Sequence, residues 1–383
     1  MTNSFDYIIA GSGLAGLSLL HRLVQDEQFA SKKILVIDGE QKTKNDRTWC
    51  FWEKGEGIFE PIVHHTWNTL SFLTPEFSKT FQMESYSYKM ILGEEFYRYV
   101  LDGAAKNPNI TFHTGNIQKI YTEGNRGMVQ TDTGKFEGEY VFNSTNLFNP
   151  EITTENSLLQ HFLGWKIKVE QPIFNPKEAT LMDFTLDQKH GTTFMYMLPT
   201  TSREALVEYT LFSPEVLERE EYEAALKTYI RIDLGITEYE ITHTEFGIIP
   251  MSLARFERSI GAEKRIINLG TAGGFTKAST GYTFYFVQKH LDNLMASLKA
   301  GKSPALTKTF RDQMLDWYDR TLLDVLLNKK VGGREIFGQL FKNVPPESVL
   351  AFLANESTAW EEFRIRHSVP LAAFIGSGMK QLF

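Results

Sequence analysis

The opening segment of the chain has a clear succession of apolar and polar stretches. The apolar run from Phe5 to Ala10 predicts a short buried strand, and the run from Lys33 to Ile37 predicts a second one. Between them, apolar residues recur at helical spacing from a glycine-rich loop to about Val24. This order of strand, loop, helix and strand predicts a βαβ unit.

The later pattern alternates between helical and β-rich stretches. A helix is predicted from Gly93 to Ala105, and short strands with turn signals follow between Ile110 and Asn143. Residues 160–250 predict mainly strands, with one helix from Pro214 to Tyr229. An amphipathic stretch from Phe310 to Leu327 opens a final helical part.

The elements together predict an α/β fold with interleaved domains, because 383 residues are too many for one ordinary domain. A strand, glycine-rich loop and helix recur late in the chain, which predicts that the first domain is discontinuous. We expect a Rossmann-type domain of residues 1–50, 86–150 and 256–300, an interleaved and mainly antiparallel β-rich substrate domain of residues 51–85 and 151–255, and a helical C-terminal region of residues 301–383.

The first glycine-rich loop has the spacing of a dinucleotide site. Gly11 allows a tight turn, Gly13 lets the backbone approach a pyrophosphate, and Gly16 lets helix and strand pack closely. The helix N-terminus offers free N–H groups to an anion, and Asp38 ends the second strand where a ribose would lie. The alternative is a glycine-rich turn in another α/β fold. The candidate cofactor-binding residues here are Gly11, Ser12, Gly13, Ala15, Gly16 and Asp38.

A second glycine-rich segment lies far along the chain. Residues 268–274 end a predicted strand, and residues 279–281 open a predicted helix. In flavoproteins similar to the aromatic hydroxylases, such a loop packs on the flavin, and the helix dipole favours a reduced, anionic flavin. The alternative is a pair of structural helix caps. The candidate residues are Gly270, Gly273, Gly274, Thr280 and Gly281.

Composition and charge exclude several classes of function. The net charge of −7 and the lack of a Lys/Arg cluster argue against nucleic-acid binding. Cys50 is the only cysteine, so no intrachain disulfide can form, and no metal site is expected. The apolar segment from Ile8 to Leu20 lacks the preceding positive charge of a secretory signal. The 29 Phe, 15 Tyr and 6 Trp form either an aromatic core or the lining of a long apolar or cationic ligand.

Several segments between residues 5 and 290 resemble, in order, the lycopene cyclases, and the bacterial lycopene β-cyclases above all. Each motif is weak to moderate by itself, but their joint order is specific. They are the glycine loop from Asp6 to Gly16, Asp46-Arg47-Thr48-Trp49-Cys50-Phe51-Trp52, Gln160-His161-Phe162-Leu163-Gly164-Trp165, Met182-Asp183-Phe184, Phe194 to Pro199, Leu206-Val207-Glu208-Tyr209-Thr210, Glu245 to Met251, and Gly270 to Tyr282.

The resemblance implies a redox-neutral cyclisation of lycopene, by way of γ-carotene to β-carotene. A proton adds to the terminal double bond, the neighbouring alkene attacks the cation, and a different proton leaves. The resemblance also implies FAD that is active in its reduced form, with NADPH or another donor needed only to keep it reduced. The Rossmann-type domain is then an FAD-binding domain.

The resemblance and the local sequence suggest roles for individual residues. Glu208 matches the family's functional carboxylate, and its apolar neighbours would raise its pKa and make it a proton donor; the alternative is a solvent-facing residue. Plant-type cyclases carry two adjacent acids where this chain has Glu208-Tyr209, so a mechanism that needs a pair of acids at this position is in doubt here.

Glu245 is a second catalytic candidate, although we favour the alternative that its side chain anchors a Gly–Pro turn that follows it. Arg47 binds the cofactor or pairs with Asp46. The candidate substrate-lining residues, which are otherwise core, are Trp49, Trp52, Phe194 and Tyr196.

Three other functions remain open on the same fold. A flavin-dependent monooxygenase or an isoprenoid reductase would oxidise the flavin in every turnover, and a non-catalytic dinucleotide-binding protein would leave Glu208 without a purpose.

The expected location is the cytoplasm, with peripheral attachment to the cytoplasmic membrane, because the implied substrate is a bilayer hydrocarbon. The expected membrane surface includes Phe337, Leu340, Phe341 and the stretch 369–375.

Overall fold

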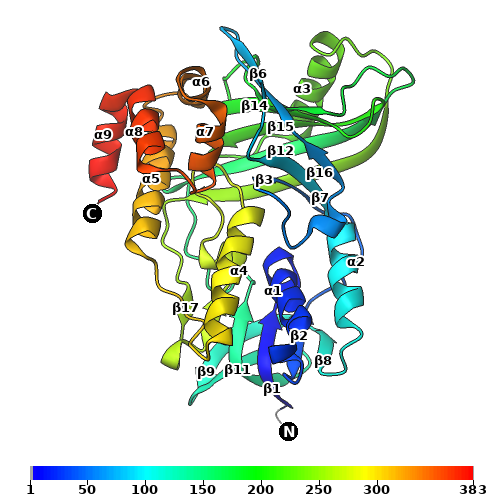
Figure 1. Ribbon diagram of the computed structural model, residues 1–383, viewed down its shortest axis with the longest axis vertical. Helices are drawn as coiled ribbons and strands as arrows, with labels where there is room; N and C mark the ends of the chain where they lie inside the picture. The colour runs from blue at the N-terminus through cyan, green and yellow to red at the C-terminus, as the bar shows by residue number, and fades with distance from the viewer. Residues whose placement is uncertain (1–2, 383) are drawn as a thin grey trace.

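The computed structural model describes residues 3–382, whose strands form three sheets. A large mixed sheet with helices α1, α2 and α4 lies at the bottom of Figure 1, and a long, mainly antiparallel sheet crosses the top. Helices α5 to α9 stack together beside the upper sheet, on the left of the view. The small sheet of β3 and β7 lies between the two large ones (Figure 1).

The lower sheet contains the predicted βαβ unit. Its central strands β11, β1, β2 and β8 are parallel, and α1 (Leu14–Gln25) connects β1 to β2. The apolar side chains of β1 and β2 are buried on both faces, as is usual for parallel sheets. The path of strands is β17 (Ser259–Ile260), β18 (Ile266–Asn268), β11 (Lys135–Asn143), β1 (Asn3–Ala10), β2 (Ile34–Asp38) and β8 (Ile110–Thr114), with β10 (Arg126–Thr131) and β9 (Ile117–Glu123) attached antiparallel beside β11.

The upper sheet has a different core on each face. On one face, Val207 and Tyr209 pack with Leu226 and Tyr229 of helix α3 (Arg219–Ile232). On the other face, Leu206 packs toward the small sheet and the C-terminal helices. The strand order is β16 (Glu240–Ser252), β12 (Ser157–Lys168), β15 (Glu204–Ser213), β14 (Thr192–Pro199), β13 (Glu178–Asp183), β5 (Thr69–Leu73) and β6 (Ser78–Gln82).

The small sheet presents opposite faces to the two large sheets. It has the order β3 (Thr48–Glu53), β7 (Ser87–Leu92) and β4 (His65–Trp67). Because side chains alternate along a strand, Trp52 joins the core against the upper sheet and Phe51 joins the core against α4 (Phe284–Lys299). Helix α2 (Gly93–Ala104) follows β7 directly and packs on α1.

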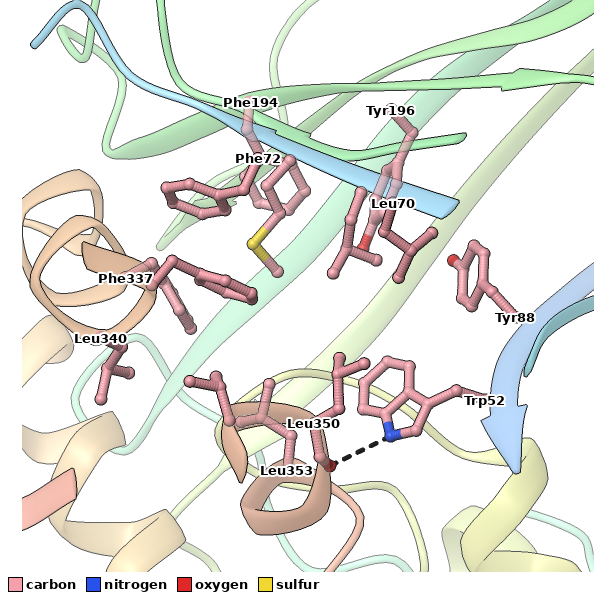
Figure 2. Close-up of a cluster of buried hydrophobic side chains, with 14 of the residues drawn as sticks. Trp52, Leu70, Phe72, Tyr88, Phe194, Tyr196, Phe337, Leu340, Leu350 and Leu353 are labelled. Carbon is pink, nitrogen blue, oxygen red and sulfur yellow. Dashed lines mark hydrogen bonds between the residues drawn. The ribbon is translucent and has the colours of Figure 1, made fainter. Parts of the chain in front are cut away.

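The C-terminal helices complete the upper core (Figure 2). Figure 2 shows Phe337 and Leu340 of α6 and Leu350 and Leu353 of α7 facing the strands, with the Trp52 indole N–H donating to the Leu350 carbonyl at 3.1 Å. The C-terminal region comprises α5 (Phe310–Leu327), α6 (Gly333–Asn343), α7 (Pro346–Leu353), α8 (Ala359–Ser368) and α9 (Leu371–Lys380).

This packing corrects part of the expected membrane surface. Phe337, Leu340 and Phe341 are buried in the core, because they form the inner face of α6 against the upper sheet. These three side chains therefore cannot contact lipid in this fold. Of the residues expected to form the membrane surface, only those in the stretch 369–375 include exposed apolar side chains. Within residues 3–382, no helix is both long and apolar enough to span a bilayer.

Candidate active site

The first glycine loop leaves an open position at the start of α1. Gly11 has a φ of +102°, and a Cβ on Gly16 would lie 2.0 Å from the Gly11 carbonyl oxygen, so both positions require glycine. A Cβ on Gly13 would meet nothing within 4 Å. Gly13 is also the N-cap of α1, without a side-chain cap and without an acidic residue in the first turn. The uncapped helix end and the free space beside it fit a pyrophosphate.

Asp38 closes this loop from the end of β2. Its carboxylate accepts hydrogen bonds from the Ser12 backbone N–H at 2.7 Å and from the Ser12 hydroxyl at 2.8 Å. Its other oxygen accepts from the backbone N–H of Glu40 at 3.2 Å. Asp38 thus holds the loop in shape and remains partly exposed at the edge where a ribose would bind.

The second glycine loop packs directly on the first. Gly270 has a φ of +54°, and a Cβ there would lie 2.9 Å from the Ala15 side chain of α1. Gly273 and Gly274 complete the short 3₁₀ turn that follows β18. Helix α4 begins at Phe284, with Thr283 as its N-cap, so residues 279–281 belong to the preceding loop and do not open the helix as we expected.

Two buried polar atoms without partners lie where this loop meets the upper sheet. The Gln160 side-chain oxygen on β12 and the Thr280 hydroxyl are both buried and have no hydrogen-bond partner. Gly281, with a φ of +72°, lies so close that a Cβ there would meet the Gln160 oxygen at 1.9 Å. Since buried polar groups are normally paired, these atoms fit a polar ligand group at the junction, such as a flavin ring edge.

Arg47 is exposed and does not form an ion pair with Asp46. Its guanidinium donates to the Asp46 backbone carbonyl at 2.8 Å, whereas the Asp46 carboxylate accepts from the Tyr97 hydroxyl at 2.9 Å. Burial raises the pKa of Glu245, and the positive charge of Arg47 opposes part of this rise. Arg47 therefore lies near Glu245, one of the two carboxyl groups described next.

One row of residues across the upper sheet carries both candidate acids. Tyr196 on β14 lies opposite Glu208 on β15, Glu208 lies opposite Gly164 on β12, and Gly164 lies opposite Glu245 on β16. Paired residues on adjacent strands point to the same face, and here this face is turned toward the small sheet and the C-terminal helices. Glu208 and Glu245 are each only 9% exposed.

This arrangement corrects our expectation for Glu245. Strand β16 runs without interruption from Glu240 to Ser252, so no Gly–Pro turn follows Glu245. Pro250 is accommodated within the strand and pairs with Leu159. Glu245 is a buried residue of the sheet and lies two strands away from Glu208.

Burial sets the protonation of both carboxyls. It raises the pKa of Glu208 to about 8, with a further increase from the negative charge of Glu245 and a decrease from the Thr210 hydroxyl. Burial raises the pKa of Glu245 to about 7, although the hydrogen bond from the Thr48 hydroxyl and the positive charge of Arg47 oppose this rise. A carboxyl that stays protonated near neutral pH can act as a general acid.

Aromatic and polar side chains surround the two acids. The Tyr196 and Tyr282 hydroxyls are 3.2 Å apart, and Trp52 meets Tyr282 edge-on with ring centroids 4.6 Å apart. Burial raises the pKa of Cys50, and the charges of Glu245 and Glu208 raise it further, so the thiol lies close to both. Sequence reasoning missed Cys50 and Tyr282 as site residues, although the alternation along β3 places Cys50 on the same face as Trp52.

Three of the four predicted lining residues share one core, and Trp49 does not. Trp52 and Tyr196 lie in the core between the small sheet and the upper sheet, on the side of Glu208 and Glu245, with Tyr88 beside them (Figure 2). Trp49 points to the opposite face of β3 and packs on Phe96 with ring centroids 5.2 Å apart. Phe194 is fully buried in the aromatic core and contributes to it together with Phe212.

A cavity opens beside Glu245. Its volume is about 260 Å³, and its wall combines Met90, Leu92 and Leu206 with the polar side chains of Thr48 and His243. It lies between the small sheet and the upper sheet, next to the row that carries the acids. Within residues 3–382, no cluster of three or more His, Cys, Asp or Glu residues is arranged to hold a metal ion.

Comparison with known proteins identifies the family. The family model described as lycopene cyclase protein matches residues 6–377. The chain belongs to the lycopene cyclase family. Two similar curated relatives are lycopene beta-cyclases: the protein from Pseudescherichia vulneris is 23% identical, with 95% of this chain and 94% of that protein covered, and the one from Pantoea ananas is 22% identical, with 97% and 96% covered.

Solved structures share the fold of this family member. A geranylgeranyl bacteriochlorophyll reductase-like protein from Thermoplasma acidophilum superposes with a TM-score of 0.66 at 11% identity, covering 98% of this chain and 99% of the other. PqsL from Pseudomonas aeruginosa, a probable FAD-dependent monooxygenase, superposes with a TM-score of 0.57 at 14% identity, covering 86% and 98%. These likenesses confirm the predicted α/β fold class, with its β-rich part and helical C-terminal region.

Proposed function

We propose that this protein is an FAD-dependent lycopene β-cyclase, an isomerase that closes the ends of lycopene into β-ionone rings. Membership of the lycopene cyclase family supports the substrate class. The observation that carries the proposal is the buried Glu208 carboxyl, whose pKa of about 8 keeps it protonated at neutral pH beside an aromatic surround.

The proposed reaction needs one acid and a site that tolerates a cation. The Glu208 O–H bond breaks as a C–H bond forms at the terminal alkene. The internal alkene then closes the ring, and a different C–H bond breaks to restore a double bond, while its proton passes to a carboxylate of the site and forms an O–H bond there. No atoms or electrons are gained or lost. Trp52 and Tyr282 present aromatic rings that favour a nearby positive charge, and the cavity beside Glu245 takes the end of the polyene.

The two glycine loops fit FAD as the cofactor. Gly13 and the free end of α1 would hold the pyrophosphate, Asp38 the ribose, and the Gly270–Gly274 turn with Thr280 the flavin end. Reduced flavin, when bound, would supply fixed negative charge that stabilises a cation in a water-poor site. We propose NADPH or another donor as the source of the electrons that keep it reduced.

Cyclisation should therefore require reduced flavin but no stoichiometric electron donor. Purified protein with pre-reduced FAD should form rings anaerobically, with far less than one NADPH oxidised per ring, because substrate and product are isomers. A constant one-to-one ratio with a product richer in hydrogen would show an isoprenoid reductase, and a strict need for oxygen would show a monooxygenase.

We also propose that the protein attaches peripherally to the cytoplasmic membrane through helices α8 and α9. Leu371, Ile375 and Met379 recur every four residues and form one exposed apolar stripe on α9. Trp360 and Phe363 are exposed on α8 and stack with ring centroids 5.5 Å apart. Two exposed arginines of α8, Arg364 and Arg366, suit anionic lipid headgroups.

Removing apolar character from this stripe should release the protein from lipid. We expect Ile375→Asp to abolish co-sedimentation with vesicles of phosphatidylglycerol and phosphatidylethanolamine, since Ile375 is 56% exposed and its replacement leaves the core intact. Ile232→Asp is the matched control, because Ile232 is 64% exposed on α3 in another part of the fold. Equal binding by both variants would refute this membrane surface.

A further inference from the structure

We propose that Glu208 and Glu245 hold one proton between them across the gap at Gly164, so that Glu245 is the second acid of the site and Gly164 positions the pair. The inference rests on the proposed cyclase function. It adds a residue from a distant strand to the single acid that the sequence motif contains.

The strand register places the two acids symmetrically about Gly164. On one side Gly164 pairs with Glu208, and on the other side it pairs with Glu245, so all three point to one face of the sheet. The two Glu backbones are then two strand spacings apart, which is roughly 10 Å. Extended Glu side chains that lean inward can shorten such a distance when the residue between them on the middle strand has no side chain.

Because Gly164 has no side chain, the Glu245 side chain extends into the space above it, beside a methyl of Leu206. A Cβ at this position would lie 3.1 Å from the Glu245 Cγ, 3.4 Å from a Glu245 carboxylate oxygen and 3.1 Å from a methyl of Leu206. The Glu245 side chain therefore already leans over Gly164, in the direction of Glu208. Any larger residue at position 164 would push Glu245 back and lengthen the separation of the carboxyls.

The surroundings favour one negative charge for the pair. Glu208 and Glu245 are both buried, and like charges at short range in a poorly solvated site cannot both persist. Thr210 donates to Glu208 at 2.9 Å, and Arg47 is the cation that acts on Glu245. The other titratable groups that face the pair or line the adjoining cavity are Cys50 of β3, Tyr88 of β7, Tyr196 of β14, Tyr282 of the second glycine loop, Lys166 of β12, His243 of β16 and His64.

A pair with one proton meets both proton requirements of the reaction. The protonated carboxyl gives its proton to the terminal alkene, and the other is already a carboxylate that can accept the different proton lost from the ring. The O–H bond broken in the first step is replaced by an O–H bond formed in the last. The site thus returns to one proton and one negative charge after each ring.

Titration of the pair tests the inference without relying on catalysis. Infrared spectra of the purified full-length protein, recorded from pH 5 to 10, follow the carbonyl band of protonated, buried carboxyls. We expect Glu245→Gln to lower the midpoint of Glu208 by about one pH unit or more, because it removes the coupled negative charge. Gly164→Ala should lower it in the same direction. Glu240→Gln, an exposed acid on the same strand β16, should leave it unchanged.

Thermal unfolding provides a second readout of the pair. Both folded-state pKa values, about 8 and about 7, are raised above the usual value near ~4.3. Stability from these groups is therefore complete below the unfolded pKa of ~4.3, and it is lost progressively as the pH rises from there to 7–8, where both folded-state pKa values lie. We expect the wild-type Tm to fall over that window and the fall to be smaller in Glu245→Gln.

The outcomes separate the pair from the cyclase activity. An unchanged Glu208 midpoint in a folded Glu245→Gln protein would overturn the pair, even if the protein cyclises lycopene. A coupled titration in a protein that never cyclises lycopene would leave the pair intact and reject the proposed function. If Gly164→Ala fails to fold, Glu245→Gln still decides the matter.

Discussion

Replacing Glu208 with glutamine should lower the rate of ring formation by roughly a hundredfold or more, the usual scale for a positioned acid–base group. Glutamine keeps the size of the side chain and can still accept the 2.9 Å hydrogen bond from Thr210, but it cannot donate a proton to an alkene. FAD binding should be unchanged, because both glycine loops lie outside this row of the sheet.

The measurement is product formation per flavin-loaded enzyme, with pre-reduced FAD and lycopene in lipid vesicles. Glu240→Gln is a suitable control, since it makes the same chemical change at an exposed site of the upper sheet. A folded Glu208→Gln protein that binds FAD and cyclises lycopene near the wild-type rate would remove Glu208 from the mechanism.

Replacing Gly13 with aspartate should abolish FAD binding without unfolding the protein. A side chain at position 13 meets no neighbour within 4 Å, and aspartate is a favourable N-cap for α1. Its carboxylate would lie where the pyrophosphate binds, and such like-charge contacts cost several kcal/mol. We therefore expect FAD affinity to fall by about two orders of magnitude or more, with a Tm at least equal to that of the wild type without FAD.

Flavin fluorescence during titration with FAD measures this affinity. Gly332→Asp is the matched control, because Gly332 is also an uncapped helix N-cap with open space, at the start of α6. Gly16 is a poorer test, since its substitution would collide with the Gly11 backbone and disturb the loop itself. Normal FAD affinity in Gly13→Asp would show that the pyrophosphate of FAD does not bind at the N-terminus of α1.

Local sequence patterns were sufficient for many of the elements but not for their partners. The apolar run of β1 and the glycine spacing predicted the βαβ unit, because its contacts are close in sequence. Glu245 was misinterpreted, since the Gly and Pro that follow it suggested a turn. In the structure, pairing with β12 along the whole strand keeps this segment extended. That register joins residues some 80 positions apart and is invisible in either segment alone.

The same limit applies to which face of an element is covered. The residues of α6 were predicted to be helical, but the sequence could not say that Phe337 and Phe341 face a sheet and are closed to lipid. Trp49 and Trp52 were grouped because they share a motif. Their odd spacing along β3 sends them to opposite cores. If strand β3 had been predicted from the sequence, the alternation of its side chains would have placed the two tryptophans on opposite faces.

Expression in a bacterium that accumulates lycopene, with separation and mass analysis of the pigments, tests whether this chain cyclises lycopene. We expect lycopene to be replaced by β-carotene, with γ-carotene as the intermediate and no change in molecular mass. Unchanged lycopene in cells that contain the folded, flavin-loaded protein, or a product whose mass has increased by hydrogen or oxygen, would contradict this expectation.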